Sequence, residues 1–375
     1  MKKVAVLGVG MVKFGRYPNV AIEELGQRAC WAALEDAGVE WKDINVAFCG
    51  HILQGSTMGQ RVFNRVGMTG IPILNVENAC ASGSSSFIMA YQSVASGMYD
   101  VALALGVEKM SFKGMIDASR QDDIERPLGM GAMPTKYAMI ARRYMEDFGL
   151  SRKELASVSV KNHRNSVNNP YSQYQHEISS EEVLNSRMIC EPLTLYQCSP
   201  TGDGAAAAVL CTLGKARRFR PGSHVTVAGC AMGSQVFVQG EPNDISEITS
   251  HTAKRAYEMW GSGPEDLNVV ELHDCFTIAE ICHYEGLGLC GKGEAKNLLL
   301  SGSTEIDGKI PVNPSGGLLS RGHPVGATGL AQIAEITWQL RGQAGARQVK
   351  GAKAGLTHTL GGGGGMACAV TILTR

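Results

Sequence analysis

Several features that mark other protein classes are missing from this sequence. No two of its eleven cysteines are spaced as Cys-x-x-Cys, so neither a disulfide scaffold nor a zinc ribbon is indicated. The 35 Lys and Arg side chains balance 35 Asp and Glu, so no net field favours nucleic acid as a partner. The apolar run at residues 4–7 is too short for a secretory signal or a membrane span. We therefore expect a cytoplasmic protein that does not span a membrane.

What the sequence does contain is a large amount of apolar material in a long chain. With 375 residues and 44% hydrophobic content, it exceeds the size at which single cores usually stop growing, and we expect two packed halves. Short apolar runs alternate with an amphipathic stretch at 21–37, which predicts an α/β fold with helices on both faces of a sheet. The runs lie at residues 4–7, 46–49, 73–76 and 101–107.

This pattern occurs twice, with a polar segment in between. Residues of about 110–199 contain Asn-rich turns and a helical stretch at 135–148, after which strand-like and helical segments alternate again. We predict an N-terminal half at 1–220, which includes this inserted loop region, and a C-terminal half at 221–375. Each half has a loop of small residues that opens a helix. If the halves pack about a pseudo-twofold axis, these helix starts face one another.

Cys80 is the first candidate for chemistry. It lies in Asn-Ala-Cys-Ala-Ser-Gly, between a strand-like run and a stretch of small residues that enters a helix. A helix start stabilises a thiolate, and small neighbours leave room for a substrate, so this position favours a nucleophile. A packed structural cysteine is the alternative.

His323 is the second candidate. It lies in Arg-Gly-His-Pro-Val-Gly, a glycine-dense loop that precedes a helical segment. The positive end of a helix disfavours imidazolium, so we expect His323 to stay neutral and to accept a thiol proton. A simple turn is the alternative for a Gly-His-Pro sequence.

His273 and Cys275 follow a strand-like segment in His-Asp-Cys-Phe. The carboxyl end of a parallel strand is where α/β sheets place their chemistry. His273 is therefore a candidate oxyanion donor and Cys275 a candidate proton donor, while Asp274 is taken as structural. A five-glycine run at 361–365, flanked by strand-like sequence, indicates backbone held close to a ligand rather than a free linker.

These motifs, in this order along the chain, resemble those of the thiolases. The resemblance extends over nearly the whole chain. The motif His-Asp-Cys-Phe makes the chain resemble the sterol-carrier-protein-type branch of the family, which includes bacterial and archaeal members. It implies two thiolase halves packed as a layered αβαβα core, an inserted loop domain that binds coenzyme A, and a homodimer or dimer of dimers.

The resemblance also implies roles for residues. Cys80 becomes the acylated nucleophile, His323 activates it, and His273 with His323 binds the thioester oxygen. A second oxyanion hole uses the backbone N–H groups of Cys80 and Gly363. Most thiolases have a second catalytic cysteine where this chain has Gly361, so Cys275 is the candidate for its proton-transfer duty.

We accordingly predict a 3-oxoacyl-CoA thiolase, an acyltransferase with coenzyme A as co-substrate and no metal in this chain. The alternatives are a retro-aldol acyl-CoA lyase of the same superfamily, a ketoacyl synthase and a non-catalytic acyl-CoA-binding subunit. The substrate stays open among acetoacetyl-CoA, longer 3-oxoacyl-CoAs and an aromatic compound such as benzoylsuccinyl-CoA. Related bacterial and archaeal enzymes often act with a small zinc-ribbon and OB-fold protein, so we also predict such a partner, to which any zinc would belong.

Overall fold

A single mixed sheet organises the molecule. The computed structural model describes residues 2–111, 131–222, 224–235, 245–363 and 365–375. Nine of the strands in these residues form one sheet in the order β3-β2-β4-β7-β1-β8-β11-β10-β9. Their bounds are β1 (Val4–Met11), β2 (Val46–Gly50), β3 (Ile73–Val76), β4 (Val101–Lys109), β7 (Asp203–Thr212), β8 (Val225–Ser234), β9 (Val269–Glu271), β10 (Ala354–Gly361) and β11 (Ala367–Thr374).

The two ends of this sheet repeat the same sequence of strand directions. In the first half β1 pairs antiparallel with β7, β7 antiparallel with β4, and β4 parallel with β2. In the second half β8, β11, β10 and β9 follow in the same antiparallel, antiparallel, parallel order. The halves join where β1 meets β8, through Ala5 opposite Thr226 and Val6 opposite Val225. The duplicated α/β architecture is therefore confirmed, whereas the boundary near residue 220 stays a prediction.

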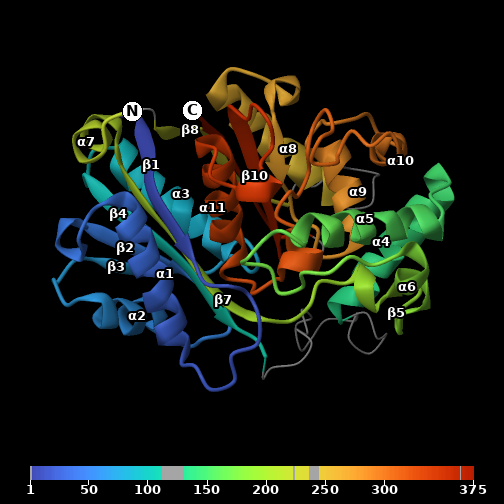
Figure 1. Ribbon diagram of the computed structural model, residues 1–375, viewed down its shortest axis with the longest axis horizontal. Coiled ribbons are helices and arrows are strands. Elements are labelled where there is room, and N and C mark those ends of the chain that lie inside the picture. Colours follow the sequence, from blue (N-terminus) through green and yellow to red (C-terminus); the bar gives the residue numbers. More distant parts are fainter. Residues whose placement is uncertain (1, 112–130, 223, 236–244, 364) are drawn as a thin grey trace.

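Helices cover the sheet in layers. α1 (Ile22–Ala37) and α2 (Met58–Val66) pack on the first half, and α8 (Ile245–Trp260) packs on β8 and β11 of the second half and on α9 (Thr277–Gly286). α3 (Ser82–Ala95) and α11 (Thr328–Arg341) contact each other and strands of both halves, and Figure 1 shows them near the middle of the molecule. They form the central layer of the αβαβα arrangement expected from the sequence.

Glycines allow the central helices to approach closely at their starts. A Cβ atom on Gly83 of α3 would lie 2.6 Å from the carbonyl oxygen of Gly326, and one on Gly329 would lie 2.2 Å from Ser84 Oγ. Ser84 Oγ is also 2.6 Å from Thr359 Oγ1 of β10, which ties α3 to the second half. The two helix starts thus face one another, as the sequence suggested.

The segment between β4 and β7 forms helices of its own. α4 (Met133–Phe148) corresponds to the helix expected at 135–148, and α5 (Arg152–Ser166) begins with a capping box between Ser151 and Glu154. These two helices pack against α9, where Lys161 of α5 forms a buried ion pair of 2.7 Å with Glu280. The smaller elements are α6 (Ser180–Asn185), β5 (Met188–Cys190), β6 (Leu193–Thr194), α7 (Leu213–Phe219) and α10 (Ala295–Leu300).

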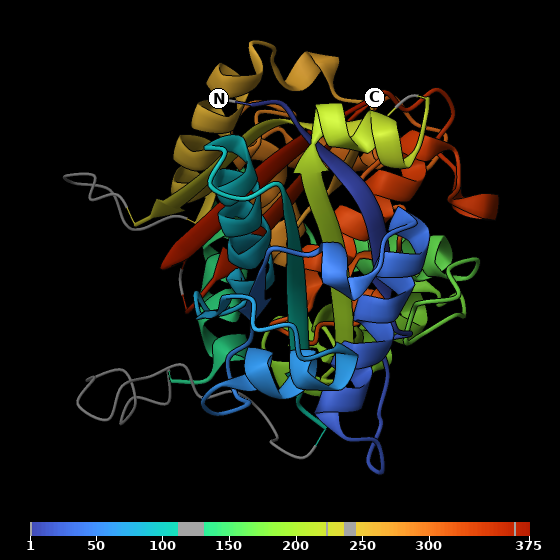
Figure 2. The ribbon, with the colours of Figure 1, turned by 90° about the vertical axis from the view of Figure 1, so that its left-hand side faces the viewer.

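Both chain ends lie on one side of the molecule, at the top of Figures 1 and 2, where β1 and β11 carry them. Within the described ranges, every helix is too short or too polar to cross a lipid bilayer. The inserted helices lie on the side opposite the open strand β3 in Figure 1.

Replacing Gly83 by alanine should destabilise the protein. The added methyl group collides with the Gly326 carbonyl, so α3 and α11 must separate, and we expect a loss of about 1–3 kcal/mol in the free energy of unfolding. Gly214→Ala in α7 is the matched control, because no heavy atom lies within 4 Å of the added Cβ. Urea unfolding midpoints compare the two variants. An equal or higher midpoint for Gly83→Ala than for Gly214→Ala would contradict the proposed close contact.

Candidate active site

Cys80 lies in a tight turn between β3 and α3. Ala79 just before it has a positive φ of 48°, a conformation that residues with a side chain rarely adopt. Polar contacts hold this turn: the backbone N–H of Asn78 donates to Ser82 Oγ at 2.9 Å, and the N–H of Ala79 donates to Glu77 Oε1 at 2.7 Å. The strained turn places Cys80 at the start of α3, where the residue is partly exposed but its thiol group is buried against His273 and His323.

Two histidines from the second half meet this cysteine. The sulfur of Cys80 and one nitrogen each of His273 and His323 all lie within 4.8 Å of one another. The two imidazole rings are perpendicular, with 5.0 Å between their centroids. His273 follows β9 and His323 lies in the loop before α11, so the sheet and the central layer bring together three residues that are far apart in the sequence.

The hydrogen bonds of Thr328 fix the tautomer of His323. Thr328 Oγ1 donates its only hydroxyl proton to the carbonyl of Pro324 at 3.0 Å, and it lies 2.7 Å from His323 Nδ1. The hydroxyl therefore accepts from Nδ1–H, which leaves the lone pair on Nε2. His323 is thus able to accept a proton at Nε2.

Both histidines are held neutral by burial. Desolvation, followed by the nearby Arg321 guanidinium, lowers the pKa of His323 to about 3. Burial lowers the pKa of His273 well below its usual value, and the neighbouring His323 adds to this effect. The expected neutrality of His323 holds, but its cause differs from the prediction: α11 begins only at Thr328, and burial rather than the helix end dominates.

The thiol of Cys80 is also neutral in the resting site. Burial raises its pKa to about 12, although hydrogen bonds from the backbone N–H groups of Gly362 and of Cys80 itself oppose the rise. We expected the start of α3 to stabilise a thiolate, and in the structure this effect is outweighed by desolvation. The resting pair is therefore a thiol beside a neutral imidazole, not a thiolate–imidazolium ion pair.

The glycine run lies against the Cys80 turn. Gly361 ends β10, and a Cβ atom there would lie 2.3 Å from the carbonyl oxygen of Asn78. No side chain fits at this position without moving the turn. The hydrogen bond to the sulfur of Cys80 comes from Gly362, the residue before Gly363, and the assignment of Gly363 to an oxyanion hole stays a prediction.

Cys275 and Asp274 follow His273 but have different surroundings. Cys275 is 4% exposed, and burial raises its pKa well above the usual value, although the phenol of Tyr137 in α4 opposes this rise. Asp274 accepts hydrogen bonds from the backbone N–H groups of Leu318 and Leu319 at 2.7 and 3.2 Å. It therefore anchors the short π-helix Gly317–Arg321, in agreement with the structural role expected for it.

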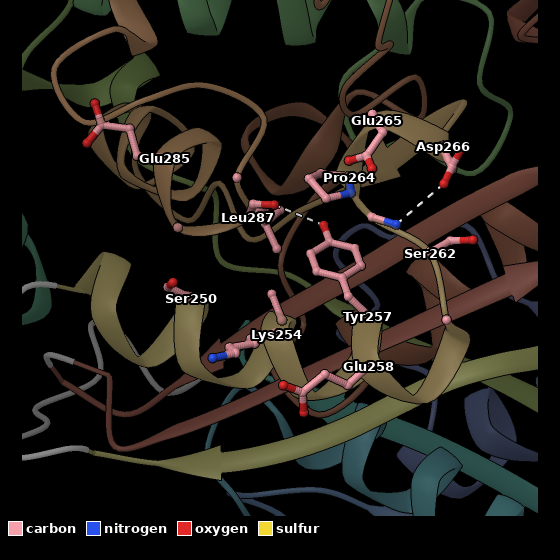
Figure 3. Close-up of a pocket in the computed structure, with 15 residues that line it drawn as sticks. Ser250, Lys254, Tyr257, Glu258, Ser262, Pro264, Glu265, Asp266, Glu285 and Leu287 are labelled. Carbon is pink, nitrogen blue, oxygen red and sulfur yellow. Dashed lines mark hydrogen bonds between the residues drawn. The ribbon is translucent and has the colours of Figure 1, made fainter.

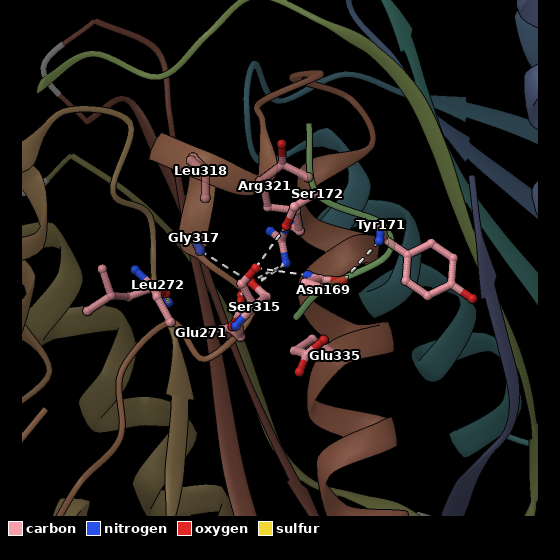
Figure 4. Close-up of polar contacts among 12 residues, drawn as sticks. Asn169, Tyr171, Ser172, Glu271, Leu272, Ser315, Gly317, Leu318, Arg321 and Glu335 are labelled. Atoms are coloured by element: carbon pink, nitrogen blue, oxygen red, sulfur yellow. Dashed lines mark hydrogen bonds and ion pairs between the residues drawn. The ribbon is translucent and has the colours of Figure 1, made fainter. Parts of the chain in front are cut away.

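A buried ion pair links the two segments that carry the histidines. Arg321 Nη1 lies 3.0 Å from Glu271 Oε2, and the two side chains are 1% and 0% exposed (Figure 4). Ser315 completes the contact, since its Oγ donates to Glu271 Oε2 at 2.7 Å and accepts from Arg321 Nη1 at 3.0 Å. Glu271 precedes His273 by two residues and Arg321 precedes His323 by two residues, so this pair fixes the spacing between the imidazoles.

Comparisons with known proteins agree with this arrangement. The Thiolase, N-terminal domain family matches residues 4–213, and the Thiolase C-terminal domain-like family matches residues 234–375. The chain belongs to the thiolase family.

Several curated thiolase relatives match along most or all of this chain. An acetyl-CoA acetyltransferase of Methanothermobacter thermautotrophicus is 43% identical, with 100% of each chain covered. Benzoylsuccinyl-CoA thiolase subunit BbsB of Thauera aromatica is 42% identical and covers 96% of this thiolase chain and 95% of its own. Human sterol carrier protein 2 is 41% identical over 97% of this chain and 71% of its own, which confirms the likeness to the sterol-carrier-protein type.

Among solved structures, the Ltp2–ChsH2(DUF35) aldolase superposes with a TM-score of 0.88 at 26% identity. The match covers 100% of this thiolase chain and 98% of that chain. The layered thiolase fold therefore accounts for the whole described structure.

Three residues near the thiolase site were not singled out from the sequence. Glu271 and Arg321 sit in apolar or glycine-rich context, and only their common offset of two residues from a candidate histidine signals a role. Tyr137 occupies the buried face of a helix, together with Ala138, Ala141 and Tyr144, a pattern that indicates core packing. Nothing in the local sequence predicts that its ring stacks on Phe276, the residue after Cys275.

Cys80, His273 and His323 also form the only group of His, Cys, Asp or Glu side chains in the described part of the chain that could hold a metal ion. A thiolate and two imidazole nitrogens are ligands that zinc prefers. A zinc ion bound there would occupy Cys80 Sγ and both histidine nitrogens. Metal binding and proton transfer between Cys80 and His323 are therefore mutually exclusive at this site.

A surface cavity of about 690 Å³ lies away from Cys80 (Figure 3). It is lined by α8, by the loop after α8 and by the end of α9 with the loop that follows it. Its lining includes Lys254, Tyr257, Glu258 and Glu265, and Tyr257 donates a hydrogen bond to the carbonyl of Leu287 at 2.9 Å. None of the residues around Cys80 contributes to it.

The pH dependence of Cys80 alkylation should reveal a thiol rather than an ion pair. With a pKa of about 12, the thiolate fraction rises with pH throughout the accessible range, so the iodoacetamide rate constant should increase about tenfold per pH unit from pH 6 to 9. Mass analysis of the Cys80 peptide measures it, with glutathione as the solution control. A rate constant that is flat across this range would instead indicate a preformed thiolate.

Proposed function

We propose that this chain is a 3-oxoacyl-CoA thiolase that transfers an acyl group between Cys80 and coenzyme A. The observation that carries the proposal is the approach of Cys80 Sγ and the two histidine nitrogens to within 4.8 Å of one another. A nucleophile beside a neutral base and a second neutral imidazole is the set that carbon–carbon cleavage next to a thioester needs. The acetyltransferase and thiolase names of its relatives support the same activity.

In the proposed first step, Nε2 of His323 accepts the proton of Cys80 as the sulfur attacks the 3-keto carbon. The bond between C2 and C3 then breaks, and its electron pair forms the enolate of acetyl-CoA. His273 and the newly protonated His323 stabilise the enolate oxygen, while the N–H groups of Cys80 and Gly363 stabilise the oxyanion on the acyl carbon. After the enolate takes a proton and leaves, the thiol of coenzyme A attacks the acyl-cysteine and releases the shortened acyl-CoA.

We further propose that Cys275 exchanges the proton at the α-carbon. The sequence resemblance implies that most thiolases have a second cysteine at the position that Gly361 occupies here. In this protein the Asn78 carbonyl leaves no room for a side chain at that position. Cys275 lies two residues after His273, and its pKa is raised first by burial and also by a negative charge on Cys80. These facts support Cys275 as the thiol for this step.

A retro-aldol lyase is the second candidate, because a solved structure with a TM-score of 0.88 is named as an aldolase. Such a reaction needs no acyl-enzyme. The position of Cys80 next to the neutral base His323 favours the covalent route instead. The thioester end of an acyl-CoA fits the donor set of Cys80, His273 and His323.

We propose a homodimer that forms through the open edge of the sheet. β3 is an edge strand, Leu74 in it is 44% exposed, and Met68 in the loop that leads to it is 82% exposed. An uncovered edge with apolar side chains is a surface that a second copy can pair with.

A zinc-ribbon and OB-fold partner also remains part of the proposal, since the aldolase noted above is named for two components, Ltp2 and ChsH2(DUF35).

Intact-mass analysis tests the thiolase proposal. The protein is mixed with acetoacetyl-CoA, a long-chain 3-oxoacyl-CoA or benzoylsuccinyl-CoA, and the mass added to Cys80 identifies the transferred acyl group. Cys80→Ala should lose the adduct and at least about a thousandfold in turnover while it stays folded. Cys290→Ala, at a partly exposed cysteine that lies outside the site, is the control and should keep both. Product formation by folded Cys80→Ala, or turnover of a 3-hydroxyacyl-CoA without an adduct, would favour the lyase.

Deuterium exchange tests the role of Cys275. In D₂O the wild-type protein should exchange the α-protons of acetyl-CoA, because a thiol can remove and return them. Cys275→Ala should lose most of this exchange, whereas acetylation of Cys80 by acetyl-CoA should persist. Cys368→Ala is the comparison, since Cys368 lies on β11 beyond the glycine run. If only Cys368→Ala loses the exchange, Cys368 rather than Cys275 exchanges the α-proton.

A further inference from the structure

A buried carboxylate of the first half lies against the loop that carries His323. Glu108 is near the end of β4, and its side chain is 0% exposed. Its Oε2 accepts a hydrogen bond from the backbone N–H of Ile52 at 2.9 Å. Its Oε1 accepts one from the N–H of Leu53 at 3.0 Å and another from the side-chain amide of Gln54. Both oxygens are therefore held by the loop that follows β2.

The same carboxylate contacts Gly326, three residues after His323. A Cβ atom added to Gly326 would lie 2.9 Å from Glu108 Oε2 and 2.7 Å from the carbonyl oxygen of Val107. In addition, a Cβ atom added to Gly106 would lie 2.4 Å from the carbonyl oxygen of Gly326. Gly326 is thus packed against the end of β4, and Glu108 supplies a charged group to this contact.

The turn that contains Gly326 orients the base. The carbonyl of Pro324 accepts hydrogen bonds from the backbone N–H groups of Ala327 at 2.9 Å and of Thr328 at 3.0 Å. Thr328 Oγ1 in turn lies 2.7 Å from Nδ1 of His323. Because Gly326 lies inside this closed turn, a shift of its backbone moves Thr328 and the imidazole with it.

We propose that Glu108 is a positioning residue for His323: its carboxylate holds Gly326 in place and so keeps Nε2 of the imidazole aligned with the sulfur of Cys80. The inference rests on the proposed function, in which His323 accepts the thiol proton. A displacement of about 1 Å in a reacting group can lower a rate about a hundredfold, so this support affects the chemical step. A residue of the first half thereby orients the base of the second half.

A carboxylate suits this position because N–H groups surround it. Burial raises the pKa of Glu108, and the hydrogen bonds from Gln54, Leu53, Ile52 and Gly326 oppose this rise. Hydrogen bonds from N–H groups to a carboxylate are about twice as strong as those between neutral groups. An amide in its place would turn one acceptor oxygen into an N–H donor that faces another donor.

Glu108→Gln tests the inference, because it keeps the volume of the side chain and replaces only one oxygen. Asp36→Asn is the matched control. Asp36 Oδ2 accepts hydrogen bonds from the backbone N–H of Val9 at 2.8 Å and from Nη1 of Arg341 at 2.6 Å. It therefore holds α11 at the end that lies about 20 Å from Thr328. For each variant, kcat and KM are measured for thiolysis of the 3-oxoacyl-CoA that acylates the wild-type protein, together with the urea unfolding midpoint.

Glu108→Gln should lower kcat about 10- to 100-fold and change KM less than about threefold, because a displaced imidazole weakens the transition state more than the bound substrate. Asp36→Asn should keep the wild-type kcat even where its unfolding midpoint falls. A wild-type kcat in folded Glu108→Gln, or an equal fall of kcat in Asp36→Asn, overturns the inference.

A second variant carries the test if Glu108→Gln does not fold. Gln54→Ala removes one donor to the carboxylate from a partly buried side chain, and it should lower kcat about threefold to tenfold with little change in KM. A wild-type kcat in Gln54→Ala then overturns the inference. Wild-type protein that forms neither acyl-Cys80 nor a shortened acyl-CoA would instead overturn the proposed function, so the two failures are distinguishable.

Discussion

Contact between the starts of α3 and α11 is the constraint on which the site depends. Cys80 and His323 belong to different halves, and each lies in the loop before one of these helices. Only glycine at 83 and 329 lets the two backbones approach to the observed distance. The buried pair of Glu271 and Arg321 then adds the His273 segment to the same point, so that three loops share one position. Such a buried pair is costly to break, because either partner alone would leave an unpaired charge.

This close packing also sets the protonation states. Desolvation dominates the pKa values of Cys80, His273 and His323, and it favours the neutral form of each. A site of neutral groups stores no ion pair before substrate binds. Charge appears only when the proton moves from sulfur to imidazole, next to N–H groups that are already in place.

Much of this arrangement was predictable from the sequence, and the reasons are local. The alternation of apolar runs predicted the duplicated α/β fold, and Cys80, His273 and His323 each followed a strand-like or glycine-rich segment that marks a loop beside the sheet. The residues that were not predictable depend on distance in space. Tyr137 has the spacing of a core residue, and its ring stacks on Phe276, the residue after Cys275, only because the inserted helices pack on α9. Likewise, no sequence pattern reveals that the Asn78 carbonyl fills the space beside Gly361.

The shared central layer has a consequence for how the chain reaches its native state. α11 packs on β1, β4 and β7 of the first half, although it is formed only by residues Thr328–Arg341 near the end of the sequence. During synthesis the first half therefore emerges with one face of its sheet uncovered until most of the chain has left the ribosome. Contacts of such long sequence separation form slowly, and apolar surface stays exposed meanwhile. The order of synthesis thus delays completion of the core, and this interval is when chaperone binding or premature association competes most strongly with folding.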